Sequence, residues 1–254
     1  MSAYSIELGG RVAIVTGGTR GLGAIIAGAL ADAGCRVAVC GRNRPDSLPK
    51  GAEYYAVDVR DADAARTFVD SVAAAHGRLD IVVNNAGGSP QASALKSSPR
   101  FVDAILKLNL VAPLYLAQAA HPHMVASGGG SIINIASVSA QRPSPDTAVY
   151  GAAKAGLVNL TQSLAQEWGP DGVRVNAIIA GLMATETAEE TYGGCAAQAK
   201  VAASIPLGRM GTGQDIADAV LWLASPMAGW VSGARINVDG GGERPYFLDL
   251  VKGG

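Results

Sequence analysis

Short apolar segments alternate with amphipathic segments along most of this chain. The first apolar segment, "VAIV" at 12–15, is a continuous run rich in β-branched residues, which is typical of a strand buried on both faces. After a glycine-rich turn, apolar residues recur at helical spacing from Ile25 to Ala33, and we expect Gly34 to end this helix. The strand-like run "RVAVCG" follows at 36–41. Residues 12–41 therefore predict a strand–helix–strand unit.

The same rhythm continues to the end of the chain. Further strands are predicted at "YYAVDV" (54–59), "LDIVVNNAG" (79–87), "GGGSIINIASVS" (128–139), "VRVNAII" (173–179) and "RINVDGG" (235–241). Helices are predicted at 61–76, about 99–124, 149–168 and 213–224, with a looser region at about 181–205. Seven strands alternating with helices predict an α/β fold, a doubly wound parallel sheet of the Rossmann type. Since no Pro- or Ser-rich linker divides the chain, we predict a single domain over 1–254.

Composition and charge exclude several classes of protein. Hydrophobic residues make up 49% and charged residues 16% of the 254 residues, which favours a compact fold with much buried structure. A net charge of −1, without a run of Lys and Arg, argues against a nucleic-acid surface or an anionic membrane partner. Three cysteines without a C-x-x-C pair argue against a disulfide framework and favour the cytoplasm. We expect no signal peptide and no membrane span, because the start lacks a basic and then apolar pattern and no apolar run approaches 18 residues.

The turn "TGGTRGLG" at 16–23 is the first candidate for chemistry. It lies between a predicted buried strand and an amphipathic helix, where dinucleotide folds bind pyrophosphate. Glycine at Gly17, Gly21 and Gly23 would permit unusual dihedral angles and let phosphate approach the backbone N–H groups. A purely structural turn is the alternative. No G-K-[ST] follows, which excludes a P-loop nucleotide site.

A tyrosine and a lysine stand four residues apart in "YGAAK" at 150–154. Positions four apart share one face of a helix, so Lys154 would lie near Tyr150. A nearby ammonium favours the phenolate and would lower a tyrosine pKa from about 10. Ser137 stands thirteen residues upstream of the tyrosine. Taken alone, a half-buried aromatic residue and a solvated lysine explain such a pair more simply.

Together these motifs resemble the short-chain dehydrogenase/reductase family, and members similar to 3-oxoacyl-(acyl-carrier-protein) reductases in particular. The resemblance extends from Arg11 to Gly242. It includes "TGGTRGLG", "NNAG" at 84–87, a C-terminal segment, and a catalytic Asn-Ser-Tyr-Lys set in the family's order: Asn109, Ser137, Tyr150 and Lys154.

The resemblance implies a role for each member of this set. Tyr150 would be the general acid or base at the substrate oxygen. Lys154 would lower the pKa of the tyrosine and hold the nicotinamide ribose. Ser137 would hydrogen-bond the substrate oxygen. Asn109 would position a water that links Lys154 to solvent.

The resemblance also implies the residues that bind a nicotinamide cofactor. Asp58 and Val59 match an adenine-contacting pair, and Thr185 matches a residue at the carboxamide. Ala180 departs from the family, which often has proline there, and this could loosen the following loop. The full implied set is Gly17, Thr19, Arg20, Gly21, Leu22, Gly23, Arg42, Asp58, Val59, Asn85, Ala86, Gly87, Tyr150, Lys154, Gly181 and Thr185.

The end of the second predicted strand favours NADP over NAD. An acidic residue there would bind the ribose 2′-hydroxyl of NAD, whereas an arginine accommodates the 2′-phosphate of NADP. Here Gly41 stands at the acidic position, Arg42 follows it, and Arg20 lies in the glycine turn. Arg44 is interpreted as a solvated loop residue. NAD remains possible.

We therefore predict an NADP-dependent oxidoreductase that acts on a small-molecule carbonyl/alcohol pair. The loop "QRPSPD" (141–146) and a substrate loop at about 181–205 are expected to border the substrate pocket. The alternatives are an NAD-dependent member of the same family, an epimerase or dehydratase that retains its cofactor, and a catalytically silent nucleotide-binding regulator. A hydrolase is not favoured, because no G-x-S-x-G is present, and no metal is expected at the histidines of "HPH" (121–123). A homo-oligomer, most simply a tetramer, is predicted through the helix at 149–168 and the last strand. The tail residues expected to dock are Tyr246, Phe247, Leu248 and Leu250.

Overall fold

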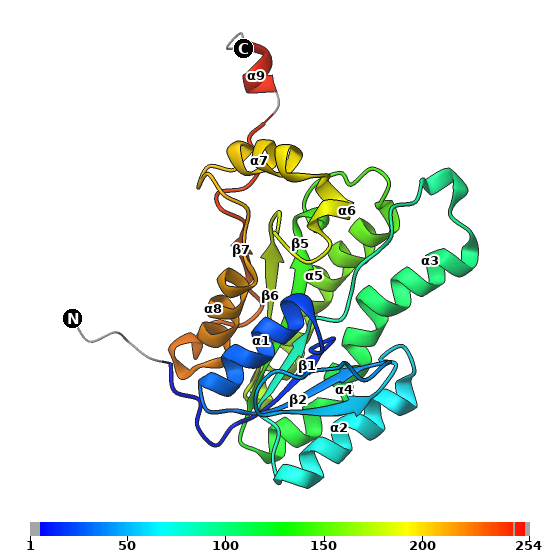
Figure 1. Cartoon of the computed structure of the whole chain (residues 1–254). Coiled ribbons are helices and arrows are strands. Elements are labelled where there is room, and N and C mark those ends of the chain that lie inside the picture. Colours follow the sequence, from blue (N-terminus) through cyan, green and yellow to red (C-terminus); the bar gives the residue numbers. More distant parts are fainter. Residues whose placement is uncertain (1–5, 246, 252–254) are drawn as a thin grey trace, which may run out of the picture.

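The computed structural model describes residues 6–245 and 247–251, and it confirms the doubly wound α/β fold (Figure 1). Within these residues, seven parallel strands form one sheet in the order β3-β2-β1-β4-β5-β6-β7. The order reverses next to β1, which creates the crevice where open α/β sheets bind ligands. The strands are β1 (Val12–Thr16), β2 (Arg36–Gly41), β3 (Ala52–Ala56), β4 (Ile81–Asn84), β5 (Gly130–Ser137), β6 (Val173–Ala180) and β7 (Arg235–Val238).

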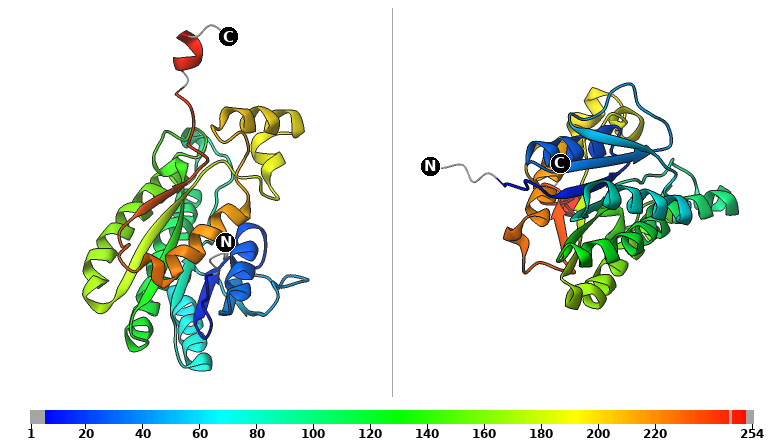
Figure 2. Two further views of the ribbon diagram at one scale, coloured as in Figure 1. Left: turned by 90° about the vertical axis from the view of Figure 1, so that its left-hand side faces the viewer. Right: turned by 90° about the horizontal axis from the view of Figure 1, so that it is seen from below.

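Helices cover both faces of this sheet (Figure 2). Helices α2, α4 and α5 pack on one face, whereas α1 and α8 pack on the other. Side chains of β1 contribute to the hydrophobic cores on both faces of the sheet. Ile14 packs in the core under α2, α4 and α5, whereas Ala13 and Val15 pack in the core under α1 and α8. The helices are α1 (Gly21–Asp32), α2 (Ala62–His76), α3 (Pro99–Leu106), α4 (Ala112–Ala126), α5 (Ala148–Trp168), α6 (Ala188–Tyr192), α7 (Cys195–Ser204), α8 (Gly213–Ala224) and α9 (Phe247–Val251).

Three segments differ from the elements predicted from sequence. Strand β3 lies at Ala52–Ala56 rather than 54–59, because the chain leaves the sheet after the Val57 amide donates to the Gly41 carbonyl at 3.0 Å. The helix predicted near 99–124 is interrupted by a π-helical turn at Lys107–Val111, between α3 and α4. The region 181–205 contains two short helices, α6 and α7, where a looser chain was predicted.

The helical run Pro99–Ala126 is long and apolar enough to cross a membrane by length and composition. In the fold, however, Leu116, Ala120 and Met124 are fully buried in the core cluster that α4 shares with the sheet and α2. Of its most apolar 18-residue window, 33% lies buried inside the protein.

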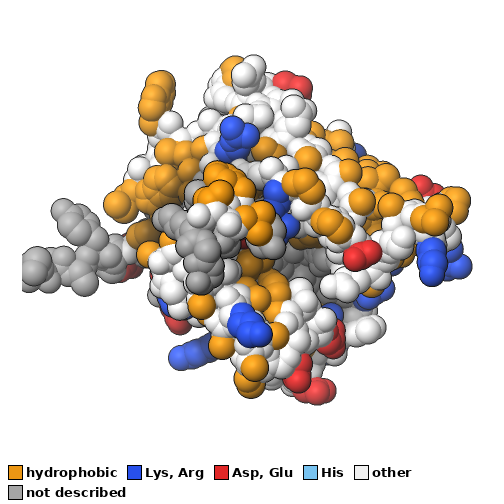
Figure 3. Space-filling view, turned by 90° about the horizontal axis from the view of Figure 1, so that it is seen from above, with side chains coloured by type: hydrophobic (Ala, Val, Ile, Leu, Met, Phe, Trp, Pro, Cys, Tyr) orange, Lys and Arg blue, Asp and Glu red, His pale blue; other side chains and the backbone are white. Residues whose placement is uncertain are grey.

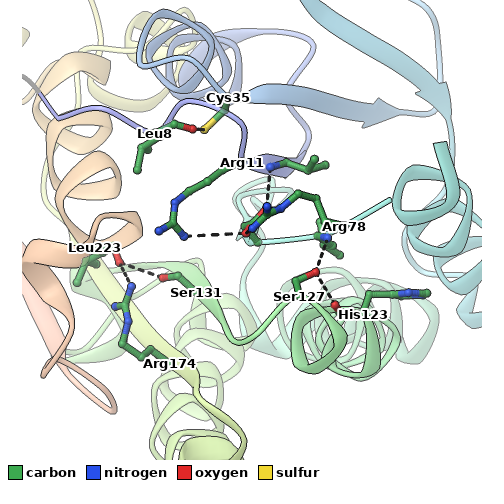
Figure 4. Close-up of polar contacts among 12 residues, drawn as sticks. Leu8, Arg11, Cys35, Arg78, His123, Ser127, Ser131, Arg174 and Leu223 are labelled. Atoms are coloured by element: carbon green, nitrogen blue, oxygen red, sulfur yellow. Dashed lines mark hydrogen bonds and ion pairs between the residues drawn. The ribbon is translucent and has the colours of Figure 1, made fainter. Parts of the chain in front are cut away.

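Polar contacts brace the amino-terminal edge of the sheet (Figure 4). The buried Asp80 carboxylate accepts hydrogen bonds from the Val12 amide at 2.9 Å and from Arg78 at 2.6 Å. On the neighbouring strands, Ser131 and Arg174 both donate to the Leu223 carbonyl at the end of α8. These contacts stabilise the amino-terminal ends of the strands. The predicted functional residues lie at the opposite, carboxyl-terminal ends.

The last helix, α9, projects away from the body of the molecule (Figure 1). Phe247 and Leu250 are exposed there. Tyr246 and the side chain of Leu248 lie outside the described part of the chain. Docking of this tail on a second subunit stays a prediction.

Candidate active site

Tyr150 and Lys154 lie in the first turns of α5, on the side that faces the end of β5. Ser137 is the last residue of β5, and its Oγ accepts a hydrogen bond from the Ser139 amide at 3.2 Å, which shapes the turn that follows. Burial raises the pKa of the Tyr150 phenol, and a hydrogen bond with Ser137 opposes part of this rise. The phenol is therefore protonated near neutrality, as a proton donor to a substrate oxygen must be.

The Lys154 ammonium is fully enclosed behind the tyrosine. Its Nζ donates to the Ile135 carbonyl at 2.8 Å and lies 5.7 Å from the centroid of the Tyr150 ring. Burial lowers the pKa of Lys154 to about 8. The pKa of the tyrosine rises rather than falls, so the lowering by Lys154 that the sequence implied is not seen in this arrangement.

Asn109 is buried within the π-helical turn and clamps the chain that follows β4. Its Nδ2 donates to the carbonyls of Gly88 and Ile105 at 3.0 Å, and its Oδ1 accepts from the Gly88 amide at 2.9 Å. A Cβ at Gly87 would lie 2.8 Å from Asn109 Oδ1 and 3.1 Å from Lys154 Nζ, so only glycine fits between these two side chains without a shift. The structure thus brings Asn109, Gly87 and Lys154 together. The water-positioning role of Asn109 stays a prediction.

The glycine turn is tied to the end of β4. Thr16 Oγ1 accepts from the amides of Asn85 and Ala86 at 3.0 Å, and Asn85 Nδ2 donates to the Thr16 carbonyl at 3.0 Å. Gly17 has a φ of +63°, and a Cβ at Gly23 would overlap the Gly17 carbonyl. The turn can therefore follow this path only with glycine at these positions.

The amino terminus of α1 opens from this turn. Its N-cap residue, Arg20, makes no side-chain capping bond, and the first turn of the helix contains no acidic residue. Leu22, in the same turn, packs against the core. Free N–H groups at a helix start attract anions, which fits the phosphate role implied for this turn. The Gly21 amide donates to Glu186 Oε1 at 3.2 Å. Sequence reasoning missed Glu186, and its place next to Thr185 was the only available hint.

The end of β2 is crowded at Gly41. A Cβ at Gly41 would lie 3.2 Å from Thr19 Oγ1, which is tighter than ordinary packing. The Gly41 carbonyl accepts from the Tyr54 hydroxyl at 3.0 Å, which fixes the turn. Arg44 is an exposed loop residue, as predicted, and its guanidinium lies 5.7 Å from the centre of the Tyr54 ring.

Asp58 stands beside the same turn, and Val59 behind it is buried. Arg60 donates two side-chain hydrogen bonds to Asp58 from Nε and one from Nη2 at 2.6 Å. These bonds, with a smaller contribution from the charge of Arg42, lower the pKa of Asp58. Arg42 and Arg20 are exposed. The carboxylate of Asp58 is thus charged and has an acceptor role.

The segment after β6 borders a cavity of about 290 Å³ at the carboxyl end of the sheet. Figure 3 looks onto this end of the molecule, where the surface is hollowed. Ala180 pairs with Ser137 and Val238 in the sheet, and a Cβ at Gly181 would lie 2.6 Å from the Asp239 Cα. Whether alanine at position 180 loosens the loop that follows stays a prediction. Thr185 is exposed, with its Oγ1 3.3 Å from Thr187 Oγ1.

Two contacts join the loop before α5 to the chain around β7, and sequence reasoning named neither pair. Arg142 Nη2 donates to Glu243 Oε1 at 2.6 Å. Gln141 Nε2 donates to Asn237 Oδ1 at 3.2 Å. The loop "QRPSPD" (141–146) is therefore held beside the tyrosine site by partners about one hundred residues further along the chain.

A buried amide network connects the sheet to α5. Asn84 Nδ2 donates to Asn134 Oδ1 at 2.8 Å, Asn134 Nδ2 donates to Thr161 Oγ1 at 2.9 Å, and the Thr161 hydroxyl donates to the Leu157 carbonyl at 2.8 Å. All four residues are at most 3% exposed. Because Thr161 lies two turns beyond Lys154, the network fixes how α5 sits on the sheet.

The two histidines of "HPH" contact different acidic residues. His121 Nε2 lies 3.0 Å from Asp171 Oδ2, and His123 Nε2 lies 2.7 Å from Asp70 Oδ1. Among residues 6–245 and 247–251, no group of three His, Cys, Asp or Glu side chains could hold a metal ion.

Comparisons with known proteins place this arrangement among dehydrogenases and reductases. A family model described as "Enoyl-(Acyl carrier protein) reductase" matches residues 17–243. The D-threitol dehydrogenase of Mycolicibacterium smegmatis is 36% identical over 247 residues, covering 94% of this chain and 95% of that protein. The 3-oxoacyl-(acyl-carrier-protein) reductase FabG of Thermotoga maritima is 32% identical over 245 residues, covering 93% and 99% of the two chains.

A solved structure shows the same fold with a cofactor. A protein from Beutenbergia cavernae, assigned as an NAD(P)-dependent gluconate 5-dehydrogenase and crystallised with NADP at low occupancy, has a TM-score of 0.86 and 34% identity. The match covers 94% of this chain and 98% of that one.

Proposed function

This chain belongs to the short-chain dehydrogenase/reductase family and is an NAD(P)-dependent oxidoreductase, and we propose that it uses NADP to interconvert a carbonyl and a secondary alcohol. The observation that carries the proposal is the pairing of Tyr150 with Ser137. A protonated phenol stands next to the Ser137 hydroxyl at the carboxyl end of β5. Such a pair can bind a carbonyl oxygen and give it a proton.

The residues present fit a dinucleotide. The glycine turn and the start of α1, which receives no capping bond from its own N-cap residue, present backbone N–H donors. Gly87 lets the backbone pass close to Asn109 and Lys154. We assign the phosphates to the start of α1 and the nicotinamide end to the region of Gly87, Lys154 and Thr185. When bound, the cofactor supplies or accepts the hydride.

Each residue of the proposed catalytic set then has a defined task. Ser137 donates a hydrogen bond to the substrate oxygen and stabilises its negative charge as the carbonyl is reduced. Tyr150 donates its phenolic proton to that oxygen, and takes the proton back when an alcohol is oxidised. The Lys154 ammonium, next to the Tyr150 ring, stabilises the phenolate once the proton has left. Asn109 holds the Gly87–Gly88 backbone in place.

The end of β2 supports NADP rather than NAD. Position 41 carries no carboxylate of the kind that selects NAD, and a Cβ there would lie 3.2 Å from Thr19 Oγ1. Arg42 and Arg20 are exposed at this turn and offer charge-assisted hydrogen bonds to a 2′-phosphate. An NAD-dependent enzyme is the second candidate, because the pyrophosphate and nicotinamide regions serve both cofactors equally.

A substrate screen tests the proposal directly. Purified protein is assayed with NADPH and with NADH against 3-oxoacyl thioesters, keto acids derived from gluconate and ketoses derived from threitol, the compound classes in the names of its relatives. We expect one class to be reduced, with NADPH preferred in kcat/KM. The proposed function would be wrong if the Tyr150→Phe variant kept the turnover of the wild type, or if NADH were preferred.

A further inference from the structure

Glu186 makes a contact that the proposed reaction does not require. It lies between β6 and α6, 165 residues from the glycine turn in sequence. Its Oε1 nevertheless accepts the hydrogen bond of the Gly21 amide at 3.2 Å, and its Oε2 lies 3.8 Å from the place of a Cβ on Gly21. Gly21 is the first residue of α1. An acidic side chain from a distant segment therefore caps this helix.

The start of α1 has no capping group of its own. Arg20 makes no capping bond, and no acidic residue stands in the first turn of this helix. By contrast, the start of α2 is capped locally, because the Asp61 carboxylate accepts from the amides of Asp63 and Ala64. Glu186 thus supplies the negative charge that the positive end of the α1 dipole favours.

The same N–H groups are those assigned above to the cofactor phosphates. Two anions cannot share one helix start, because they would compete for one set of donors and repel each other. We propose that Glu186 is a determinant of cofactor affinity, a built-in competitor that must leave the start of α1 before a dinucleotide phosphate binds there. This inference rests on the proposed placement of the phosphates at α1.

The surrounding backbone allows Glu186 to leave. On one side, residues 182–184 are held by a short ladder with Gly211, in which the Ala184 amide donates to the Gly211 carbonyl at 2.8 Å. On the other side, Ala188 is buried at the start of α6. Between these anchors, residues 185–187 are exposed. Glu186 can therefore swing out while both anchors stay in place.

Binding measurements on charge-removing variants test this inference. The dissociation constants of NADPH and NADH are measured by calorimetry for the wild type, Glu186→Gln and Glu186→Ala. An exposed carboxylate at a helix start is worth about 0.3–1 kcal/mol, so we expect both variants to bind both dinucleotides about two- to fivefold more tightly. The matched control is Glu190→Gln, which removes the same charge from an exposed position four residues further along. It should leave both constants unchanged.

Hydrogen exchange without any cofactor gives an independent readout. In the Glu186→Ala variant, the peptide that contains Gly21 should exchange faster than in the wild type, because its amide has lost its acceptor. Support requires both results. Unchanged or weaker dinucleotide binding in the Glu186 variants, an equal effect in Glu190→Gln, or unchanged exchange at Gly21 would each overturn the inference.

The design separates this inference from the proposed function. Because the phosphates are common to NADPH and NADH, the gain from removing Glu186 should be the same factor for both. A wild type that prefers NADH would refute the proposed use of NADP and leave that common factor intact. A wild type that binds neither dinucleotide would overturn both.

Discussion

Replacing Lys154 by methionine should remove a pH-dependent cost of folding while it destroys the site. The lysine side chain is 3% exposed, and burial alone lowers its pKa from 10.5 to about 8. A charged group that is held in a low-dielectric interior opposes folding. Methionine has a similar length and flexibility but needs no hydration.

The size and sign of the effect follow from the two pKa values. Below about pH 8, Lys154 is charged in both the folded and the unfolded protein, and the folded state bears the full cost. At about 1.4 kcal/mol for each pH unit, the fall from 10.5 to about 8 corresponds to a cost of about 3 kcal/mol. Between pH 8 and 10.5 the unfolded state binds more protons, so the wild type gains stability relative to the variant as pH rises. Above pH 10.5 the cost is gone.

Urea unfolding at fixed protein concentration from pH 7 to 10.5 measures this change. We expect the free energy of unfolding of the wild type, minus that of Lys154→Met, to rise by about 3 kcal/mol between pH 8 and 10.5. The lost hydrogen bond to Ile135 shifts the whole curve but not its slope. Lys107→Met serves as the control, because Lys107 is exposed and its difference curve should be flat. A flat curve for Lys154→Met would show that the buried lysine is not desolvated as the geometry indicates.

Four further outcomes are expected. Tyr150→Phe should lower kcat by at least about 10²-fold in steady-state assays while calorimetry shows unchanged NADPH affinity, because only the proton donor is lost. Arg42→Ala should raise the KM for NADPH by about tenfold or more and leave that for NADH nearly unchanged, since a charge-assisted hydrogen bond is worth about 1.5–3 kcal/mol; equal effects on both would contradict its role. Thr161→Val should cost about 1–3 kcal/mol in urea unfolding by leaving Asn134 Nδ2 without its acceptor, and Thr161→Ser should restore most of it. Light scattering should show a tetramer, and a monomer at micromolar concentration would count against the predicted interfaces.

Most of the fold could be predicted because the spacing of apolar residues within a short segment distinguishes a strand from a helix. The run at 12–15 and the helical spacing after it were sufficient to predict β1 and α1. The errors occurred where contacts between distant segments determine where an element ends or is interrupted. Val57 and Val59 look like strand residues, yet Val59 is buried in the core after the chain has left β3. The π-helical turn at Lys107–Val111 could not be predicted either, since nothing in its sequence marks the extra residue that places Asn109 on Gly88.

The site residues likewise fall into two groups, those that could be predicted from the sequence and those that could not. The order of Asn109, Ser137, Tyr150 and Lys154 in the chain was enough to name them, and the structure brings all four to the carboxyl ends of β4 and β5. The contacts of Glu186 and of Arg142 could not be named, because each partner lies about one hundred residues or more away in the sequence. An exposed glutamate has the same local pattern whether it faces water or the start of a helix.

The tyrosine–lysine pair shows why spacing predicts proximity better than it predicts pKa. Four residues of helix place Lys154 beside Tyr150, and the structure confirms that the two share one face. The spacing cannot reveal that the helix buries this face, and burial acts on each group in its own direction. It disfavours the phenolate of Tyr150 and the ammonium of Lys154 alike, so both groups are driven toward their neutral forms. A neutral phenol is the form that can protonate a carbonyl oxygen. In this arrangement the lysine contributes most after the proton has been transferred, when its charge can stabilise the phenolate that remains.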